Sequence, residues 1–309
     1  MVKRHINDAR VLGSGMIRKL PALAILAFGL QAGTSLASDI PVAAVSNLRI
    51  YSSFWQNLHH FLYVSAWARR TISAGTRSLA MPLPPGSDVS MTSDEKATWD
   101  KAVAVYDREF ASKDLLFDRG MTMIKLGLSD RDDALTDAPL DDELKLLLMS
   151  VAPIYRTYWW PAHDAANRAW IDDAVRRTRT YAPAIIARLT TLYGVPWFAT
   201  TVRVDVVRVG KSQGAYTSNS PTHIVVASAD DSYGQWSSVE MLFHESSHGL
   251  IEKVSAAVNR ALAASKKPPN DLWHVVLFYI SGEITRQELA KDGVEYTPYL
   301  YATGLFDRA

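Results

Sequence analysis

The sequence predicts an α+β fold that is predominantly helical, with a small sheet placed before a final pair of helices. Apolar residues recur at helical spacing through most of the first two thirds of the chain. The later runs "TVRVDVVRVG" and "THIVVASAD" instead alternate or are β-branched, as strands are. A composition of 48% hydrophobic and 21% charged residues over 309 positions allows a large buried core.

The first 37 residues predict a secretory signal peptide. Five basic residues precede the apolar run "LPALAILAFGL", and small residues follow at Ser35 and Ala37. The alternative is a retained membrane anchor, but the apolar run is short for a span, which takes roughly 20 residues. We therefore expect cleavage near Ala37, a periplasmic or secreted protein, and no membrane contact after cleavage.

The net charge and the absence of cysteine exclude several kinds of partner and of chemical site. The predicted signal peptide holds five of the 33 basic and one of the 32 acidic side chains, which leaves 28 and 31 and a net charge near −3. Such a charge argues against a nucleic-acid partner. The absence of cysteine excludes disulfides, thiolate metal ligands, a cysteine nucleophile and a lipid-bearing cysteine.

The rest of the chain is expected to form a helical region, 38–196, and a second region, 197–309, that carries the sheet. Turn residues in "KSQGAYTSNSP" join the two strand-like runs, so 201–229 is expected to form an antiparallel pair. Gly194 and Pro196 supply the stop signal of the last helix in the first region. The predicted helices of that region lie at about 47–70, 94–111, 141–151 and 164–193.

Two helices are expected after the sheet. The spacing of Ser237 and Glu240 matches a capping box, which places "EMLFHESSHGLIEKV" in the first turns of a helix. "KKPPND" interrupts the chain near Pro268, and "DLWHVVLFYISGEITRQEL" predicts a second, deeply buried helix.

His244 and His248, in "HESSH", predict a zinc site. Residues four apart share a helical face, so both imidazoles can reach one tetrahedral ion. Glu245 points to one side, where it can hold a metal-bound water whose pKa zinc lowers to about 7, and accept its proton. The alternative is a pair of surface or core histidines on an ordinary amphipathic helix.

The third ligand is expected on the following helix, at Glu283 or His274. In an antiparallel hairpin that turns near Pro268, the residue level with Ser246 is about Ala290, since both arms rise equally. Glu283 lies about one to two helical turns from this position, and His274 lies more than about four turns from it. Glu283 is therefore the preferred third ligand, and His274 is the alternative.

Each candidate ligand also has an ordinary structural explanation. Glu283 would form a buried ion pair with an arginine such as Arg286, and His274 would be a core histidine bonded to a backbone carbonyl. Nine residues separate the two, close to half a turn around a straight helix, so both are not expected to ligate unless Gly282 breaks the helix.

"HESSH", followed on the next helix by "ISGEITR", resembles the gluzincin branch of zinc metallopeptidases over about Trp236 to Leu289. The resemblance implies a zincin-like fold and peptide-bond hydrolysis. It also implies that His244, His248 and Glu283 bind zinc and that Glu245 is the general base. The metzincin pattern is excluded, because isoleucine and valine stand at positions 251 and 254, where that class has glycine and histidine.

The resemblance also implies that substrate backbone binds along a strand edge within "GAYTSNSPTHIVVAS", which the alternative treats as structural sheet. Hydrolysis further needs a donor for the transition-state oxyanion. Tyr279, one turn before Glu283, is the first candidate, and His274 is the second. His223 and Tyr216 are further candidates.

Three other stretches are interpreted as structural. His59 and His60 are adjacent and point in different directions on a helix, so we interpret them as packing residues and not as a second metal site. "YRTYWWPAHDAANRAW" is interpreted as aromatic core instead of a substrate cleft. "SDRDDALTDAPLDD" lacks the ligand spacing of a calcium loop and predicts a solvated surface.

The functional hypothesis is a zinc-dependent metallopeptidase that acts on a peptide or protein substrate. One rival is a non-catalytic periplasmic protein in which zinc, or an empty site, merely braces two helices. Closed four-ligand coordination would mark that case, whereas an open fourth position marks an enzyme. Another rival is a zinc hydrolase of non-peptide amides.

Overall fold

The computed structural model describes residues 40–73, 90–131, 134–198, 200–210, 214–263 and 272–305. The chain divides into two compact units, Met1–Leu36 and Ala37–Ala309, and the described residues all belong to the second. The predicted signal peptide lies outside the described residues. Within them, no helix has both the length and the apolar character needed to cross a membrane.

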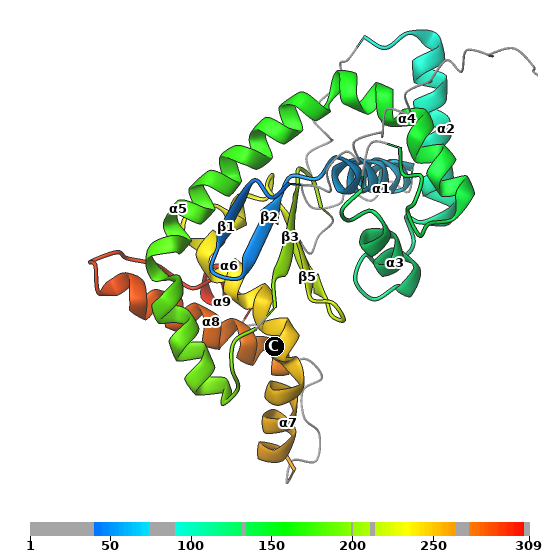
Figure 1. Ribbon diagram of the computed structural model, residues 1–309. Coiled ribbons are helices and arrows are strands. Elements are labelled where there is room, and N and C mark those ends of the chain that lie inside the picture. The colour runs from blue at the N-terminus through cyan, green and yellow to red at the C-terminus, as the bar shows by residue number, and fades with distance from the viewer. Residues whose placement is uncertain are drawn as a thin grey trace, which may run out of the picture. The chain divides into compact units, whose positions relative to one another are not determined.

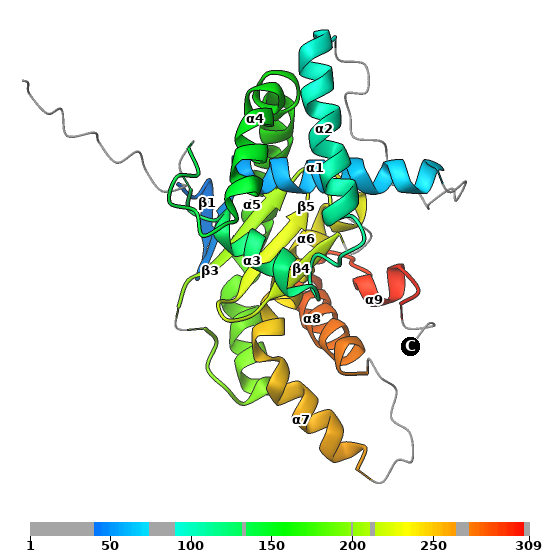
Figure 2. The ribbon, with the colours of Figure 1, turned by 90° about the vertical axis from the view of Figure 1, so that its right-hand side faces the viewer.

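A five-stranded mixed sheet organises the described part of the chain, with the order β1-β2-β3-β5-β4 (Figure 1; β4 is labelled in Figure 2). β2 and β5 both run parallel to β3, while β1 is antiparallel to β2 and β4 is antiparallel to β5. The strands are β1 (Ala43–Val45), β2 (Leu48–Tyr51), β3 (Val202–Val207), β4 (Ala215–Ser218) and β5 (His223–Ala227).

Helices lie on both faces of this sheet (Figure 2). They are α1 (Phe54–Ser73), α2 (Ser93–Glu109), α3 (Arg119–Gly127), α4 (Asp142–Tyr158), α5 (Trp160–Tyr193), α6 (Trp236–Ser247), α7 (Ile251–Ala261), α8 (Leu272–Ala290) and α9 (Tyr299–Ala302), with single 3-10 turns at η1 (Asp231–Tyr233) and η2 (His248–Leu250).

Two hydrophobic cores form, one on each face, because side chains of a strand alternate between its faces. Val206 of β3 packs with residues of α5, α6 and α8, whereas the next residue, Val207, packs with α1, α2 and α4. The side chain of each strand residue is therefore assigned to one helical layer by its position in the strand.

The predominantly helical α+β class is confirmed, but the expected antiparallel arrangement is wrong in part. "TVRVDVVRVG" and "THIVVASAD" contain β3 and β5, which are parallel, because the segment expected to be only a turn contributes β4. β4 takes the antiparallel position beside β5 and forms one edge of the sheet.

The expected helix at 47–70 begins only at Phe54, because 48–51 forms β2. Leu48 and Ile50 are buried while Arg49 and Tyr51 are partly exposed, which is the alternation of a strand. Three later expected helices correspond to α2, α4 and α5, and α5 ends as predicted at Gly194, whose φ is 65°. α3 was not expected.

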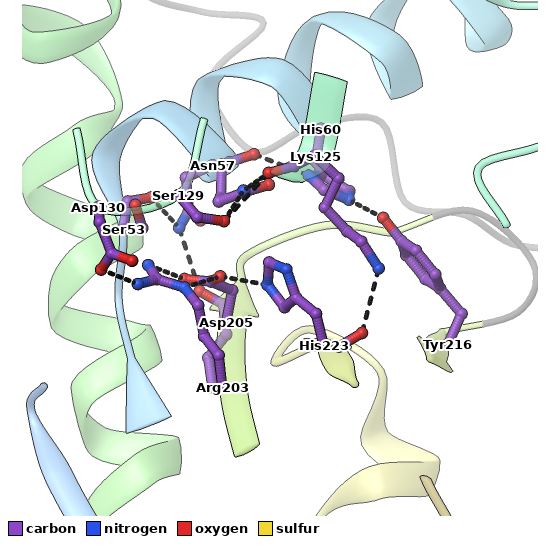
Figure 3. Close-up of polar contacts among 12 residues, drawn as sticks. Ser53, Asn57, His60, Lys125, Ser129, Asp130, Arg203, Asp205, Tyr216 and His223 are labelled. Carbon is purple, nitrogen blue, oxygen red and sulfur yellow. Dashed lines mark hydrogen bonds and ion pairs between the residues drawn. The ribbon is translucent and has the colours of Figure 1, made fainter. Parts of the chain in front are cut away.

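A network of buried polar side chains lies on the face of the sheet that α1 and α3 cover (Figure 3). Arg203 holds both oxygens of Asp205, at 2.7 and 2.9 Å, and His223 Nε2 lies 2.6 Å from the same carboxylate. Lys125 enters from α3 and donates to the carbonyl of His223 at 3.1 Å. Nδ1 of His60, on α1, faces the Gln56 carbonyl, which can only accept, so Nδ1 carries the proton. Nε2 therefore accepts a hydrogen bond from the Tyr216 hydroxyl at 2.9 Å. 

His59 is likewise buried, with Nδ1 2.9 Å from the hydroxyl of Tyr106, so both adjacent histidines have partners inside the core. Neither belongs to the group of side chains that could hold a metal ion among the described residues. Their contacts agree with the interpretation of these histidines as packing residues.

Exchange of Asp205 for Asn should destabilise the fold by roughly 3 kcal/mol or more, because it removes the fully buried carboxylate that pairs with both Arg203 and His223. Burial raises the pKa of Asp205, but Arg203 and His223 outweigh it and lower the pKa from 3.8 to about 2. The wild-type advantage is therefore fully present above about pH 4 and is lost as pH falls through about 2. Denaturant unfolding at several pH values measures this difference.

Asp130→Asn is the matched control, because Asp130 is an exposed partner of the same Arg203. Its effect should stay within about 0.5 kcal/mol. Equal costs for the two variants would contradict a special contribution of the buried carboxylate.

Candidate metal centre

The candidate metal centre lies where α6 and α8 pack against each other in antiparallel register. Oε1 of Glu240 lies 3.0 Å from the Cβ that an alanine would have at position 282. One turn further along α6, the rings of His244 and Phe278 stack with centroids 3.5 Å apart. One more turn brings the rings of His248 and His274 to 5.1 Å. The two helices therefore meet in three successive layers.

The start of α6 differs from the expectation. The helix begins at Trp236 after Gln235, whose side chain forms no cap, so the predicted capping box of Ser237 and Glu240 is absent. The carboxylate of Glu240 instead points inward, where it accepts hydrogen bonds from the Tyr296 hydroxyl at 2.5 Å and from the backbone N–H of Tyr299 at 3.0 Å.

Three imidazoles converge in this contact. One ring nitrogen from each of His244, His248 and His274 lies within 4.8 Å of the other two. The Nε2 atoms of His244 and His248 are 3.2 Å apart. Tetrahedral zinc with Zn–N bonds of about 2.0–2.1 Å separates its nitrogen ligands by about 3.3 Å, so these two rings already have the spacing of a metal site.

The environment keeps the imidazoles of His244 and His248 neutral, which is the form that binds a metal. Burial lowers the pKa of His244 well below 6.5, and the neighbouring His248 and His274 lower it further. Burial, with a contribution from His274, lowers the pKa of His248 to about 3. At neutral pH, protons therefore compete only weakly with a metal ion for the ring nitrogens of these two histidines.

The cluster opens toward solvent on one side. His244 is fully buried, whereas His248 and His274 are partly exposed. Trp273 stands beside both of the exposed histidines, with its ring 5.8 Å from that of His248 and 5.0 Å from that of His274. A ligand would therefore approach past this indole.

Glu245 follows the first histidine and is held by the sheet. The hydroxyl of Thr217, on β4, lies 2.6 Å from Oε2 of Glu245. Oε1 makes no hydrogen bond within the described part of the chain. Burial raises the pKa of Glu245 to about 7, against the opposing effects of the Thr217 hydrogen bond and the Lys125 charge.

Glu283, the preferred third ligand from the sequence, is not in the group that the structure brings together. Its Oε2 accepts hydrogen bonds from Arg286 at 2.7 and 3.0 Å, which is the ion pair considered as its ordinary explanation. His274, the alternative ligand, is in the group.

The hairpin estimate failed for a physical reason. It assumed one continuous helix from His248 to the turn, but α6 ends at Ser247, and the 3-10 turn η2 separates it from α7. Because η2 interrupts the helix between α6 and α7, the residues of α7 cannot be counted as part of one straight arm of the hairpin. The expected turn near Pro268 lies outside the described residues.

The structure shows where three of the candidate donors for the transition-state oxyanion lie. Tyr279 is 50% exposed and lies about 140° around α8 from His274, so it does not share the face that meets α6. The hydroxyl of Tyr216 is bound to His60, and His223 pairs with Asp205 on the opposite face of the sheet.

No protein-family model, no curated protein and no solved structure matches this chain. The functional argument therefore depends on the residues and their geometry.

His274→Ala should weaken zinc binding by more than about 100-fold, because it removes a direct donor, and loss of an outer-shell partner alone costs 10–100-fold. Glu283→Gln is the matched control and should leave the zinc affinity unchanged, since its carboxylate faces Arg286. Competition with a chromophoric chelator measures both variants. The reverse pattern would identify Glu283 as the third ligand.

Proposed function

We propose that this protein is a zinc-dependent hydrolase of peptide bonds, in which His244, His248 and His274 bind the metal and Glu245 is the general base. The observation that carries the proposal is the convergence of three imidazoles at the contact between α6 and α8, with the buried carboxylate of Glu245 next to His244 in the chain. The proposal keeps the metallopeptidase hypothesis of the sequence and exchanges Glu283 for His274 as the third ligand.

The donor set fits zinc better than calcium or magnesium, which prefer oxygen ligands. Three histidines with a vacant fourth position form one of the known catalytic zinc sets. When bound there, zinc supplies a Lewis acid that lowers the pKa of a bound water to about 7. A purely structural zinc would need a fourth protein ligand, and the group among the described residues contains three.

Glu245 is suited to accept and return a proton. Thr217 fixes Oε2, so Oε1 remains for the proton that is removed from the attacking water. A carboxylate with a pKa of about 7 can act as a base and afterwards as an acid near neutral pH. The same proton can then pass from Oε1 to the departing nitrogen of the cleaved amide.

Peptide substrates are supported by the position of β4. This strand forms the edge of the sheet, and Thr217 within it contacts Glu245 of α6. All four residues of β4 are buried, so an extended peptide could add to this edge through main-chain hydrogen bonds only after the covering residues move aside. A non-peptide amide would not use this edge.

Glu245→Gln should retain one equivalent of zinc yet lose at least about 100-fold in kcat, the lower range of what a general base contributes. The amide side chain keeps the shape of the carboxylate but cannot accept the proton. Metal analysis and a peptide-library cleavage screen, run together with simple non-peptide amides, measure both properties.

Glu252→Gln, an exposed substitution at the start of α7, serves as the control and should retain full activity. Full activity in Glu245→Gln would contradict the assignment of the general base.

A further inference from the structure

Four aromatic rings form a continuous stack behind the metal centre. His244 lies against Phe278, with ring centroids 3.5 Å apart and planes at 17°. Phe278 lies against Tyr299, at 5.4 Å and 15°, and Tyr299 lies against Tyr233, at 5.6 Å and 21°. The rings come from α6, α8, α9 and η1, so four separate segments meet in one nearly parallel column.

The far end of this column is fixed. Tyr233 is 4% exposed, and a Cβ added to Gly214 would lie 2.2 Å from its ring, so the start of β4 presses directly on it. The carbonyl of Tyr233 also accepts a hydrogen bond from the indole of Trp170 at 3.0 Å. The column therefore has a rigid base at the sheet and ends at His244.

The segment 294–305 carries the third ring and is anchored to α6 itself. Glu240, one turn before His244, accepts the Tyr296 hydroxyl and the Tyr299 N–H on one oxygen. Between these contacts Pro298 packs on Gly282, where an added Cβ would come within 2.7 Å of the proline ring. α9 consequently lies against α8 (Figure 2).

The ring of His244 has only a weak hydrogen bond to the Leu277 carbonyl, so the stack adds to what orients it. A histidine that binds a metal ordinarily donates its other N–H to a carboxylate or carbonyl, which sets the ring orientation. Nδ1 of His244 is buried and makes no hydrogen bond of ordinary geometry with a described residue. The Leu277 carbonyl raises the pKa of this ring, but as the smallest of four influences.

We propose that residues 294–305 form a C-terminal clamp of the metal centre: Tyr299 holds Phe278 against the face of His244 and so keeps Nε2 directed at the other two histidines. Tyr299 is a positioning residue, and Glu240 is its anchor. This inference rests on the proposed metal site. It adds that zinc binding also requires residues 294–305, although none of the three proposed ligands lies in that segment.

Tyr299→Ala should weaken zinc binding by at least about tenfold, the scale on which outer-shell partners act. Tyr299→Phe should bind zinc like the wild type, because it keeps the ring. Tyr296→Phe removes only the hydroxyl that bonds Glu240, and it should weaken zinc binding less than Tyr299→Ala does. Tyr301→Ala, in the same short helix but 44% exposed, is the control and should have no effect.

The measurement is chelator competition with zinc on the full chain, with thermal unfolding of the metal-free protein as a parallel readout. Weaker zinc binding in Tyr299→Ala, with Tyr299→Phe intact, supports the clamp. Wild-type affinity in folded Tyr299→Ala overturns it while leaving the metal site standing. If Tyr299→Ala does not fold, unchanged affinity in Tyr296→Phe overturns the clamp. A wild-type chain that binds no zinc overturns both proposals.

Discussion

The antiparallel contact between α6 and α8 is the constraint on which the candidate metal centre depends. Each helix presents a row of residues one turn apart, and the rows meet in reverse order. The approach is close because Gly282 has no side chain: a Cβ there would lie 3.0 Å from Glu240 and 2.7 Å from Pro298. A larger residue would separate the helices and would move His274 away from His244 and His248.

Local patterns predicted most of the fold, and long-range pairing limited the rest. The alternation in "TVRVDVVRVG" and the stop signal at Gly194 are local, and both β3 and the end of α5 follow from them. β3 and β5 pair in parallel because β4 lies between them in the chain and takes the antiparallel position beside β5. The residue pattern within β3 or β5 alone does not show this. The spacing of Ser237 and Glu240 matched a cap, but the tertiary contact of Glu240 with the C-terminal segment decided its role.

The same distinction applies to the candidate site. His244 and His248 could be paired from sequence because one helical turn fixes their relation. The choice between His274 and Glu283 required the path of the chain after His248, and the break at η2 removed the assumption on which counting relied. A usable signal was present in the second helix, where His274 and Phe278 are four apart and so share the face that packs on α6.

His244 and Glu245 are adjacent, and adjacent residues of a helix point about 100° apart. One supporting surface therefore cannot orient both side chains. The structure supplies two: β4 holds Glu245 through Thr217, and the C-terminal segment backs His244 through Phe278. Because α6 lies between these supports, the carboxylate and the imidazole are each held by a separate element. The proposed roles of His244 as a metal ligand and of Glu245 as a base each require a fixed orientation, and separate supports can provide it.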